Sequence, residues 1–272
     1  MSAQKLIKDI IRSTVPFFIG RIAGIELQVA YCILNDSLNH SHIAELENNA
    51  GIKVTDHISL LQYADQLITA YEHCTTIAEW DGLVYTITGK GQELIRKKVP
   101  DVPRIHARNL EPYYYQDSWM SEMKGKRILI VHPFALEDRV AELSNIFPDR
   151  EWFDSCTFTF FKPPVTLAGN HEGKDWREHY EECVDRLSAV TDYDIALVAA
   201  GGYGMLIADY IYMEQKKSVM YVGGALQIFF GVIGKRWFDN KEILEMMNDS
   251  WVRPEKKDKP VNFGAVEKGC YW

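Results

Sequence analysis

Two strand–glycine–helix units follow one another over residues 194–237, and they constrain the fold more than any other part of the chain. The sequence there is DIALVAAGGYGMLIADYIYMEQKKSVMYVGGALQIFFGVIGKRW. Each unit opens with a short, almost wholly apolar run, Ile195–Ala200 in the first and Ser218–Val222 in the second. Such runs are typical of strands that are buried on both faces of a parallel sheet. The stretch therefore predicts an α/β fold.

Glycines follow both runs, at positions 201, 202 and 204 and at positions 223 and 224. Glycine lets the backbone approach a ligand closely, and a following helix directs unpaired N–H groups and its positive dipole end at that ligand. Two such turns at the carboxyl edge of a sheet form a seat for a diphosphate. The alternative, that the glycines only permit tight turns, is favoured for either turn alone. Both turns together, closed by Lys235, Arg236 and Trp237, favour the ligand.

Composition limits the class of protein and of partner. The chain has 272 residues, 47% of them hydrophobic and 25% charged, as in ordinary globular proteins. Its formal net charge of −8 argues against nucleic acid as the main partner. No apolar run approaches membrane-spanning length, and the charged, amphipathic start is not typical of a signal peptide. Five scattered cysteines without C-x-x-C spacing indicate reduced thiols in a cytoplasmic protein and no zinc site. The sequence is compatible with a monomer or a homo-oligomer.

We expect one domain over 1–272, with a subdomain boundary in the proline-flanked range 100–125. The part before residue 118 is predicted to be rich in helix, over 3–13, 22–38 and most of 41–98, with a strand or hairpin over 80–88. The part from 126 onward alternates strands and helices. It includes a buried strand at ILIV (128–131) and an amphipathic helix over 175–190.

Two more expected strand ends carry polar side chains. Arg21 and Glu26 flank the turn after a β-type run at 15–19. Arg21 suits a phosphate, and Glu26 suits a sugar hydroxyl, a metal ion or the role of a base. On the local pattern alone, an ion pair between them is favoured. His132 directly follows ILIV and would titrate in a useful range as a general acid or base, and a structural histidine is an equal alternative.

The chain ends in Glu267-Lys268-Gly269-Cys270-Tyr271-Trp272, which is unusual for a frayed tail. We expect these residues to dock onto the body. If they dock near the glycine turns, they line the pocket. The residues expected at the acceptor or along the pocket are Asp249, Arg253, Glu267 and Tyr271.

Six segments together resemble the GT-D-fold-like proteins, which include bacterial polysaccharide-biosynthesis proteins and nucleotide-sugar glycosyltransferases. They are GRIAGIE (20–26), VHPF (131–134), GGYG (201–204), VGGALQIFFGVIGKRW (222–237), WVRP (251–254) and VEKGCYW (266–272). The resemblance spans nearly the whole chain. It implies a Rossmann-like, mostly parallel sheet flanked by helices. It also implies transfer of a sugar from a nucleoside diphosphate donor, a UDP-sugar above all, to a glycan acceptor.

The resemblance also bears on metal ions. Relatives carry an Asp-x-Glu pair, within an Arg-Phe-Gly-Asp-Gly-Glu type of stretch, that handles a divalent metal. Arg21 and Glu26 match the ends of that stretch, but Gly24 stands at the Asp position. One carboxylate is a poor Mg²⁺ or Mn²⁺ site unless the diphosphate supplies the other ligands. The alternative is a metal-independent enzyme whose arginines and lysines, Arg253 among them, offset the charge of the leaving diphosphate.

The leading hypothesis is a glycosyltransferase with Glu26, and second His132, as the catalytic groups. The expected diphosphate site consists of Arg21, Gly201, Gly202, Tyr203, Gly204, Gly223, Gly224, Gln227, Lys235 and Arg236. One alternative is an NAD-type oxidoreductase, although GGYG departs from G-x-G-x-x-G because Leu206 and Ile207 stand where the third glycine belongs. The other alternative is a nucleotide-sugar binding protein without catalytic activity.

Overall fold

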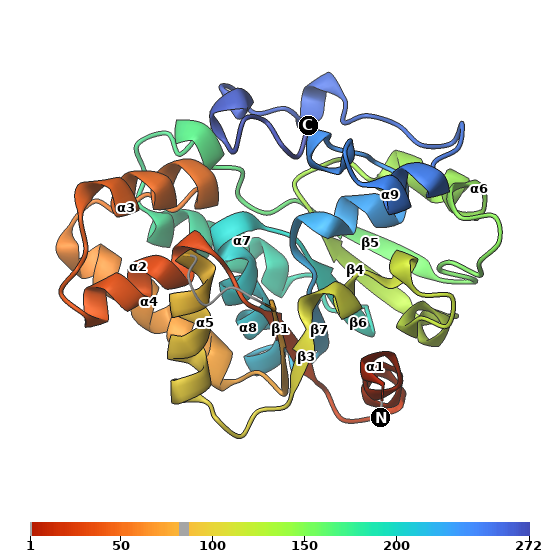
Figure 1. Ribbon diagram of the computed structural model, residues 1–272, viewed down its shortest axis with the longest axis horizontal. Coiled ribbons are helices and arrows are strands. Elements are labelled where there is room, and N and C mark those ends of the chain that lie inside the picture. Colours follow the sequence, from red (N-terminus) through yellow and green to blue (C-terminus); the bar gives the residue numbers. More distant parts are fainter. Residues whose placement is uncertain (1, 82–86) are drawn as a thin grey trace.

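A parallel β-sheet organises the molecule in the computed structural model, which describes residues 2–81 and 87–272 (Figure 1). Its seven strands run in the order β3-β2-β1-β7-β6-β4-β5, and every neighbouring pair is parallel. The strands are β1 (Phe18–Arg21), β2 (Thr76–Glu79), β3 (Arg104–His106), β4 (Arg127–Val131), β5 (Thr157–Phe161), β6 (Ile195–Val198) and β7 (Ser218–Tyr221). Helices flank the sheet, so the predicted Rossmann-like α/β class is confirmed.

The central strands are buried on both faces, which explains why their sequences do not alternate with polar residues. In β6, Leu197 packs into the core on one face of the sheet, and Val198 packs into the core on the other. Leu197 lies in register with Ile130 of β4 and with Met220 of β7. Burial of each such side chain is worth about 2 kcal/mol, so uniformly apolar runs suit this position.

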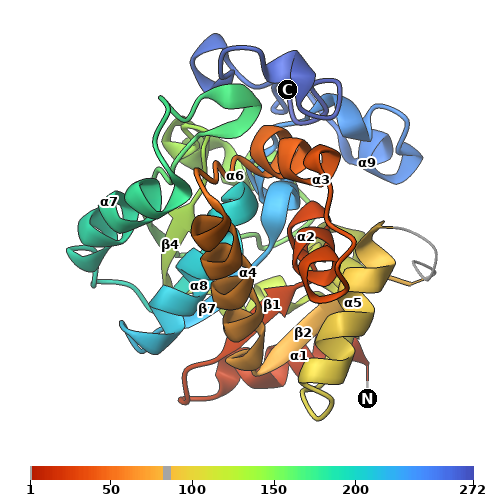
Figure 2. The same ribbon diagram turned by 90° about the vertical axis from the view of Figure 1, so that its left-hand side faces the viewer.

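Five helices cover one face of the sheet, and Figure 2 looks onto this layer. They are α2 (Ile25–Leu34), α4 (His57–Glu72), α5 (Ile87–Lys98), α7 (Trp176–Ser188) and α8 (Gly204–Met213). The short α3 (His40–Glu45) continues into a π-helix, Leu46–Ala50, beside this layer. The other face is covered by α1 (Ala3–Arg12), α6 (Leu143–Ile146), α9 (Lys241–Met246) and several 3-10 helices.

Side-chain caps fix where several of these helices begin. Asp56 accepts from the backbone N–H of Ser59 at the start of α4. Asp175 starts α7 with a capping box, and its carboxylate also accepts from the hydroxyls of Thr55 and Ser59. Burial raises the pKa of Asp175, but the hydrogen bond from the Arg177 guanidinium at 2.7 Å, together with these bonds, holds it well below its usual range. The cap therefore joins α7 to the start of α4.

Two strands lie where the sequence predicted other structure. Strand β2 falls inside the range 41–98, which was predicted to be mostly helical, and its four residues are all buried. The strand or hairpin predicted over 80–88 begins only after β2 ends, and its central part, 82–86, lies outside the described residues. Strand β3 falls in the predicted linker. It is an edge strand whose Arg104 pairs with Glu79 of β2 at 3.0 Å, and edge strands tolerate such charges.

The second glycine turn also leads to a different helix type from the first. After β6 the chain enters the α-helix α8, as predicted, but after β7 it forms the 3-10 helix Gly223–Phe230. Gly231 ends that helix in a left-handed conformation. In the described parts of the chain, no helix combines the length and apolar character that crossing a membrane requires.

Candidate functional site

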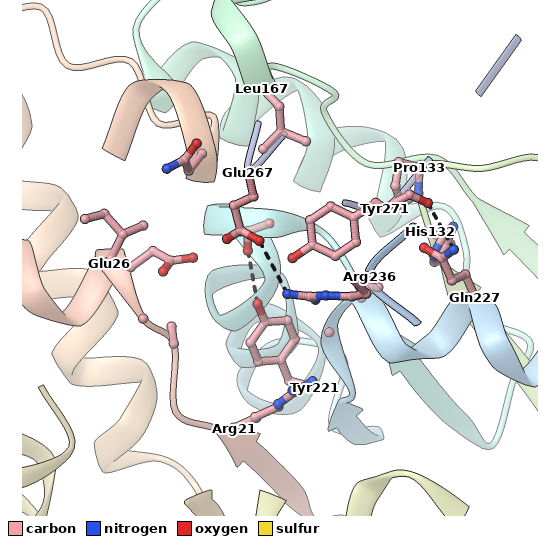
Figure 3. A pocket seen from close by; sticks show the side chains of 18 of the residues that line it. Arg21, Glu26, His132, Pro133, Leu167, Tyr221, Gln227, Arg236, Glu267 and Tyr271 are labelled. Atoms are coloured by element: carbon pink, nitrogen blue, oxygen red, sulfur yellow. Dashed lines mark hydrogen bonds and ion pairs between the residues drawn. The ribbon is translucent and has the colours of Figure 1, made fainter. Parts of the chain in front are cut away.

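A cavity of about 450 Å³ lies at the carboxyl edge of the sheet (Figure 3). Residues at or just after the ends of five strands line it: Arg21–Glu26 for β1, Trp80 for β2, His132–Phe134 for β4, Ala199 and Gly201 for β6, and Gly223 and Gly224 for β7. Open parallel sheets bind ligands at this edge, and small-molecule sites measure about 300–1,000 Å³. Position and size therefore mark it as the candidate ligand site.

Segments distant in sequence complete the walls. Glu45 and Asn49 come from the end of α3 and the π-helix, and Leu167 comes from the long loop before α7. The C-terminal residues Glu267, Tyr271 and Trp272 form another part of the lining. The tail is docked, as expected, because Trp272 is buried and the backbone N–H of Arg236 donates to the carbonyl of Cys270 at 2.8 Å.

Arg21 is held in a fixed position at the end of β1. Its guanidinium donates to the carbonyl oxygen of Val222, lies 4.6 Å from the centre of the Trp80 ring, and approaches Glu111 Oε1 at 3.8 Å. The prediction of an ion pair between Arg21 and Glu26, which the local pattern favoured, is wrong, because Arg21 approaches Glu111 instead. A planar cation fixed in this way is prepared to bind a phosphate.

Glu26 stands in the first turn of α2, across the cavity from Glu267 (Figure 3). The residue is 8% exposed, and burial raises the pKa of its carboxyl. A hydrogen bond from its own backbone N–H opposes that shift, and the charge of Glu267 adds to it. Glu26 thus takes up a proton more readily than a solvated glutamate, as a buried catalytic carboxyl does.

His132 was predicted to titrate in a range useful for a general acid or base, and the structure contradicts this. Burial lowers its pKa to about 3, so the imidazole is neutral at neutral pH. Its Nδ1 accepts from the backbone N–H of Phe134 at 3.0 Å, which leaves the proton on Nε2. His132 is therefore suited to donate a hydrogen bond to a ligand rather than to act as a base.

Arg236 is the second arginine of the cavity. Its Nη2 lies 3.3 Å from Glu267 Oε2, and its guanidinium lies 4.6 Å from the centre of the Tyr271 ring. Gln227, buried beside it, donates through Nε2 to the carbonyls of Val232 and Tyr271 at 3.1 and 3.2 Å. The segment 227–236 therefore positions both the arginine and the C-terminal tail.

The five glycines of the two turns serve different purposes. Gly201 and Gly223 have φ of +51° and +72°, a region that favours glycine, and both line the cavity together with Gly224. Gly202 and Gly204 lie outside the lining, where a Cβ atom would overlap Ile52 and the Tyr221 ring. Tyr203 lies outside it too, buried in the core.

Three tyrosine hydroxyls hold the carbonyls of these strand ends. Tyr63 donates to Gly202, Tyr221 donates to Gly201, and Tyr71 donates to Arg21, at 2.8, 3.2 and 2.8 Å respectively. Tyr71 also accepts from the backbone N–H of Ala23 at 2.9 Å. These bonds satisfy buried backbone groups and keep the cavity wall in place without a ligand.

Besides Gly202, Tyr203 and Gly204, three further predicted site residues lie outside the cavity lining. Lys235, Asp249 and Arg253 are exposed and absent from its lining. The Arg253 guanidinium instead lies 4.3 Å from the centre of the Phe238 ring. Of the cations predicted to offset a diphosphate's charge, the structure brings Arg21 and Arg236 together.

Sequence reasoning missed other lining residues. Trp80 could have been found only by locating β2, because it is the first residue after that strand. Glu45, Asn49 and Leu167 carry no local signal, since they reach the cavity through the packing of α3, the π-helix and the long loop. Tyr221 lies inside the apolar run predicted over Ser218–Val222 and is the last residue of β7, and its hydroxyl's contact with Gly201 gives it a role at the cavity.

Within residues 2–81 and 87–272, no group of three or more His, Cys, Asp or Glu side chains is placed to hold a metal ion. A divalent ion at Glu26 would thus depend on oxygen ligands from a bound diphosphate. All five cysteines are free.

A second, shallower hollow of about 590 Å³ shares Trp80 and Arg236 with the cavity. Its lining includes Arg108, whose guanidinium lies 3.9 Å from the centre of the Tyr114 ring. Asn240 donates to the Tyr114 hydroxyl at 2.9 Å. The two hollows thus meet at an arginine and a tryptophan.

Known proteins do not extend this picture. Comparison of the chain with protein-family models, with curated proteins and with solved structures finds no match in any of the three. The GT-D-like resemblance therefore stays a prediction.

Proposed function

We propose that this protein is a glycosyltransferase that binds a nucleoside diphosphate sugar, a UDP-sugar above all, and passes the sugar to a glycan acceptor. The observation that carries the proposal is the meeting of Arg21 and Arg236 with the glycine turn at 223–224 in one cavity at the carboxyl edge of a parallel sheet. Two guanidinium groups beside a glycine turn match the charge and the oxygen geometry of a diphosphate.

The lining groups have distinct roles in this proposal. Arg21 and Arg236 offset the charge that develops on the leaving diphosphate as its bond to the sugar carbon breaks. The neutral His132 donates a hydrogen bond from Nε2 to a phosphate or sugar oxygen. Glu26, in its ionised form, accepts the proton of the acceptor hydroxyl while the new carbon–oxygen bond forms.

The shared boundary of the two hollows gives the acceptor a route. Because Trp80 and Arg236 belong to both linings, a group in the second hollow lies next to the arginine that would hold the diphosphate. We infer that the acceptor approaches from this side.

A nucleotide-sugar binding protein without catalytic activity would use the same contacts. An assay of donor hydrolysis and sugar transfer distinguishes it from a glycosyltransferase. An NAD-type oxidoreductase is less favoured, because Gly202 and Gly204 of GGYG serve packing and lie outside the cavity.

Two neighbouring residues provide a matched test. Arg236 lines the cavity whereas Lys235 does not, so Arg236→Gln removes one site cation and Lys235→Gln removes an equal charge outside the site. We expect UDP to raise the melting temperature of the wild type and of Lys235→Gln. The stabilisation amounts to about 2.7 kcal/mol at 100 times the dissociation constant. In Arg236→Gln the shift should largely disappear.

Nucleotide and metal panels complete the test. UDP, GDP and UDP-sugars are compared with NAD, with and without Mn²⁺ and a chelator, and UDP release is followed with a panel of glycan acceptors. A melting shift with NAD and none with UDP would contradict the proposal. Binding of UDP-sugar without donor hydrolysis or transfer would identify a non-catalytic binder.

A further inference from the structure

The anion-binding group of the cavity is already in contact with an anion of the chain itself. Arg236 Nη2 lies 3.3 Å from Glu267 Oε2, and both side chains are drawn at the centre of Figure 3. The Tyr271 ring of the same tail lies where a Cβ of Gly224 would be. The C-terminal tail thus covers two of the groups that a bound diphosphate would use.

The tail is anchored on both sides of Glu267, so we expect the side chain of Glu267 to move without the backbone. Val266 is fully buried before it, and after it the carbonyl of Cys270 accepts from the Arg236 backbone at 2.8 Å. Glu267 and Lys268 have φ of +44° and +59°, and Gly269 has +74°. This left-handed turn projects the Glu267 side chain, 48% exposed, over the cavity.

Arg236 holds the Glu267 carboxylate beside a second carboxylate of the cavity. Glu26 lies across the cavity from it, and each negative charge disfavours the other. The Cys270 thiol donates a weak hydrogen bond to the same carboxylate, with sulfur and oxygen 3.0 Å apart. A half-exposed ion pair of this kind is weak, so a stronger anion can displace it.

We propose that the Glu267 carboxylate is a built-in competitor that occupies Arg236 until the phosphate groups of a nucleotide displace it. The displaced side chain turns to solvent while the tail stays docked. The inference rests on the proposed function in taking the ligand to be a nucleoside diphosphate, but its physical content applies to any phosphate that reaches Arg236.

The test is the affinity for UDP and, separately, for inorganic pyrophosphate, measured by calorimetry on wild type and Glu267→Gln. Glutamine keeps the size of the side chain and removes its charge, so we expect both ligands to bind about fivefold more tightly to the variant. Glu245→Gln, on the exposed side of α9, is the control for the change in net charge and should bind as the wild type does.

Glu267→Asn is the second variant, because asparagine tolerates a left-handed backbone and its short amide does not reach Arg236. It should gain as much affinity as Glu267→Gln. Unchanged or weaker binding in both variants would overturn the inference and show that Glu267 is indifferent to the ligand or helps to hold it.

The two proposals fail in different ways. If UDP binds the wild type as tightly as it binds Glu267→Gln, the competitor role is overturned and the proposed function stands. If pyrophosphate binds Glu267→Gln more tightly than it binds the wild type, and UDP binds each protein no more tightly than pyrophosphate does, the competitor role stands and the nucleotide ligand is overturned. If neither ligand binds either protein, both proposals are overturned.

Discussion

The turns after β6 and β7 look alike in sequence, but their glycines have different roles. After β6, Gly202 and Gly204 are packed by Ile52 and Tyr221, and an α-helix follows. After β7, Gly223 and Gly224 face Arg21 and Tyr271 in the cavity wall, and a 3-10 helix follows. A glycine pair after a buried strand thus indicates a close approach, but not what approaches. In the first turn Gly202 and Gly204 pack against the protein's own core while Gly201 lines the cavity, whereas in the second turn both glycines line the cavity.

The turn after β6 should be the more sensitive of the two to added side-chain volume. Gly204→Ala places a methyl group into the Tyr221 ring, whose hydroxyl is bonded to Gly201 and cannot easily move. We expect the free energy of unfolding to fall by about 3 kcal/mol, the upper end for overpacking. Urea denaturation measures it. Gly264→Ala is the control, since nothing lies within 4 Å of its added Cβ, and equal losses in the two variants would contradict the comparison.

His132, which follows β4 and lines the cavity, provides a test through the pH dependence of stability. Its pKa is about 3 in the folded protein and about 6.5 in the unfolded chain, so below pH 6.5 only the unfolded state takes up the proton. Stability should therefore fall by about 1.4 kcal/mol per pH unit, or about 2 kcal/mol between pH 6.5 and 5.

The measurement is the free energy of unfolding as a function of pH in wild type and His132→Asn. Asparagine can accept the backbone N–H two residues on, as His132 does from Phe134, but it does not titrate. The variant should lose this part of the acid sensitivity. An unchanged pH profile would show that the imidazole is not buried.

The turn after β7 should tolerate added volume better than the turn after β6. In Gly224→Ala the new methyl group meets the Tyr271 ring, which belongs to the C-terminal tail. We expect a loss of about 1 kcal/mol in unfolding free energy, at the low end for overpacking, and UDP binding at least about tenfold weaker. A loss as large as that of Gly204→Ala would erase the distinction between the turns.

The smallest effect concerns Glu26, the carboxyl between β1 and the cavity. Because its pKa is raised in the folded state, the stability it contributes is full below its unfolded pKa and is lost as pH rises through the folded pKa. Glu26→Gln should therefore gain stability relative to the wild type as pH rises from 4 to 8. If the difference between the two proteins does not change with pH, Glu26 is more solvated than the structure shows.

Much of the fold followed from local pattern. The buried strands β4, β6 and β7 and the helices α1, α7 and α8 were predicted close to their observed positions, because short uniformly apolar runs and helical apolar spacing are strong local patterns. Strands β2 and β3 were missed. Thr76–Glu79 is too short for a period to show, and Arg104–His106 carries charges that only an edge position makes acceptable.

The site was predicted in part for the same reason. Residues that follow strongly apolar strands, such as His132, Gly201 and Gly223, were found because all parallel strands end at one edge. Where each side chain points was not accessible. Of the adjacent Lys235 and Arg236, only the arginine enters the lining, and a charge pattern does not tell such neighbours apart.

By itself, the sequence determined a parallel sheet with glycine turns at neighbouring strand ends, since burial on two faces and backbone freedom leave marks within a few residues. Only the tertiary structure decided which glycines face the cavity, that Arg21 pairs with Glu111 rather than Glu26, and that Glu267 reaches Arg236 from the end of the chain. The reason is physical. Secondary structure follows from interactions between near neighbours in sequence, whereas a cavity and its charges arise where segments up to hundreds of residues apart pack together.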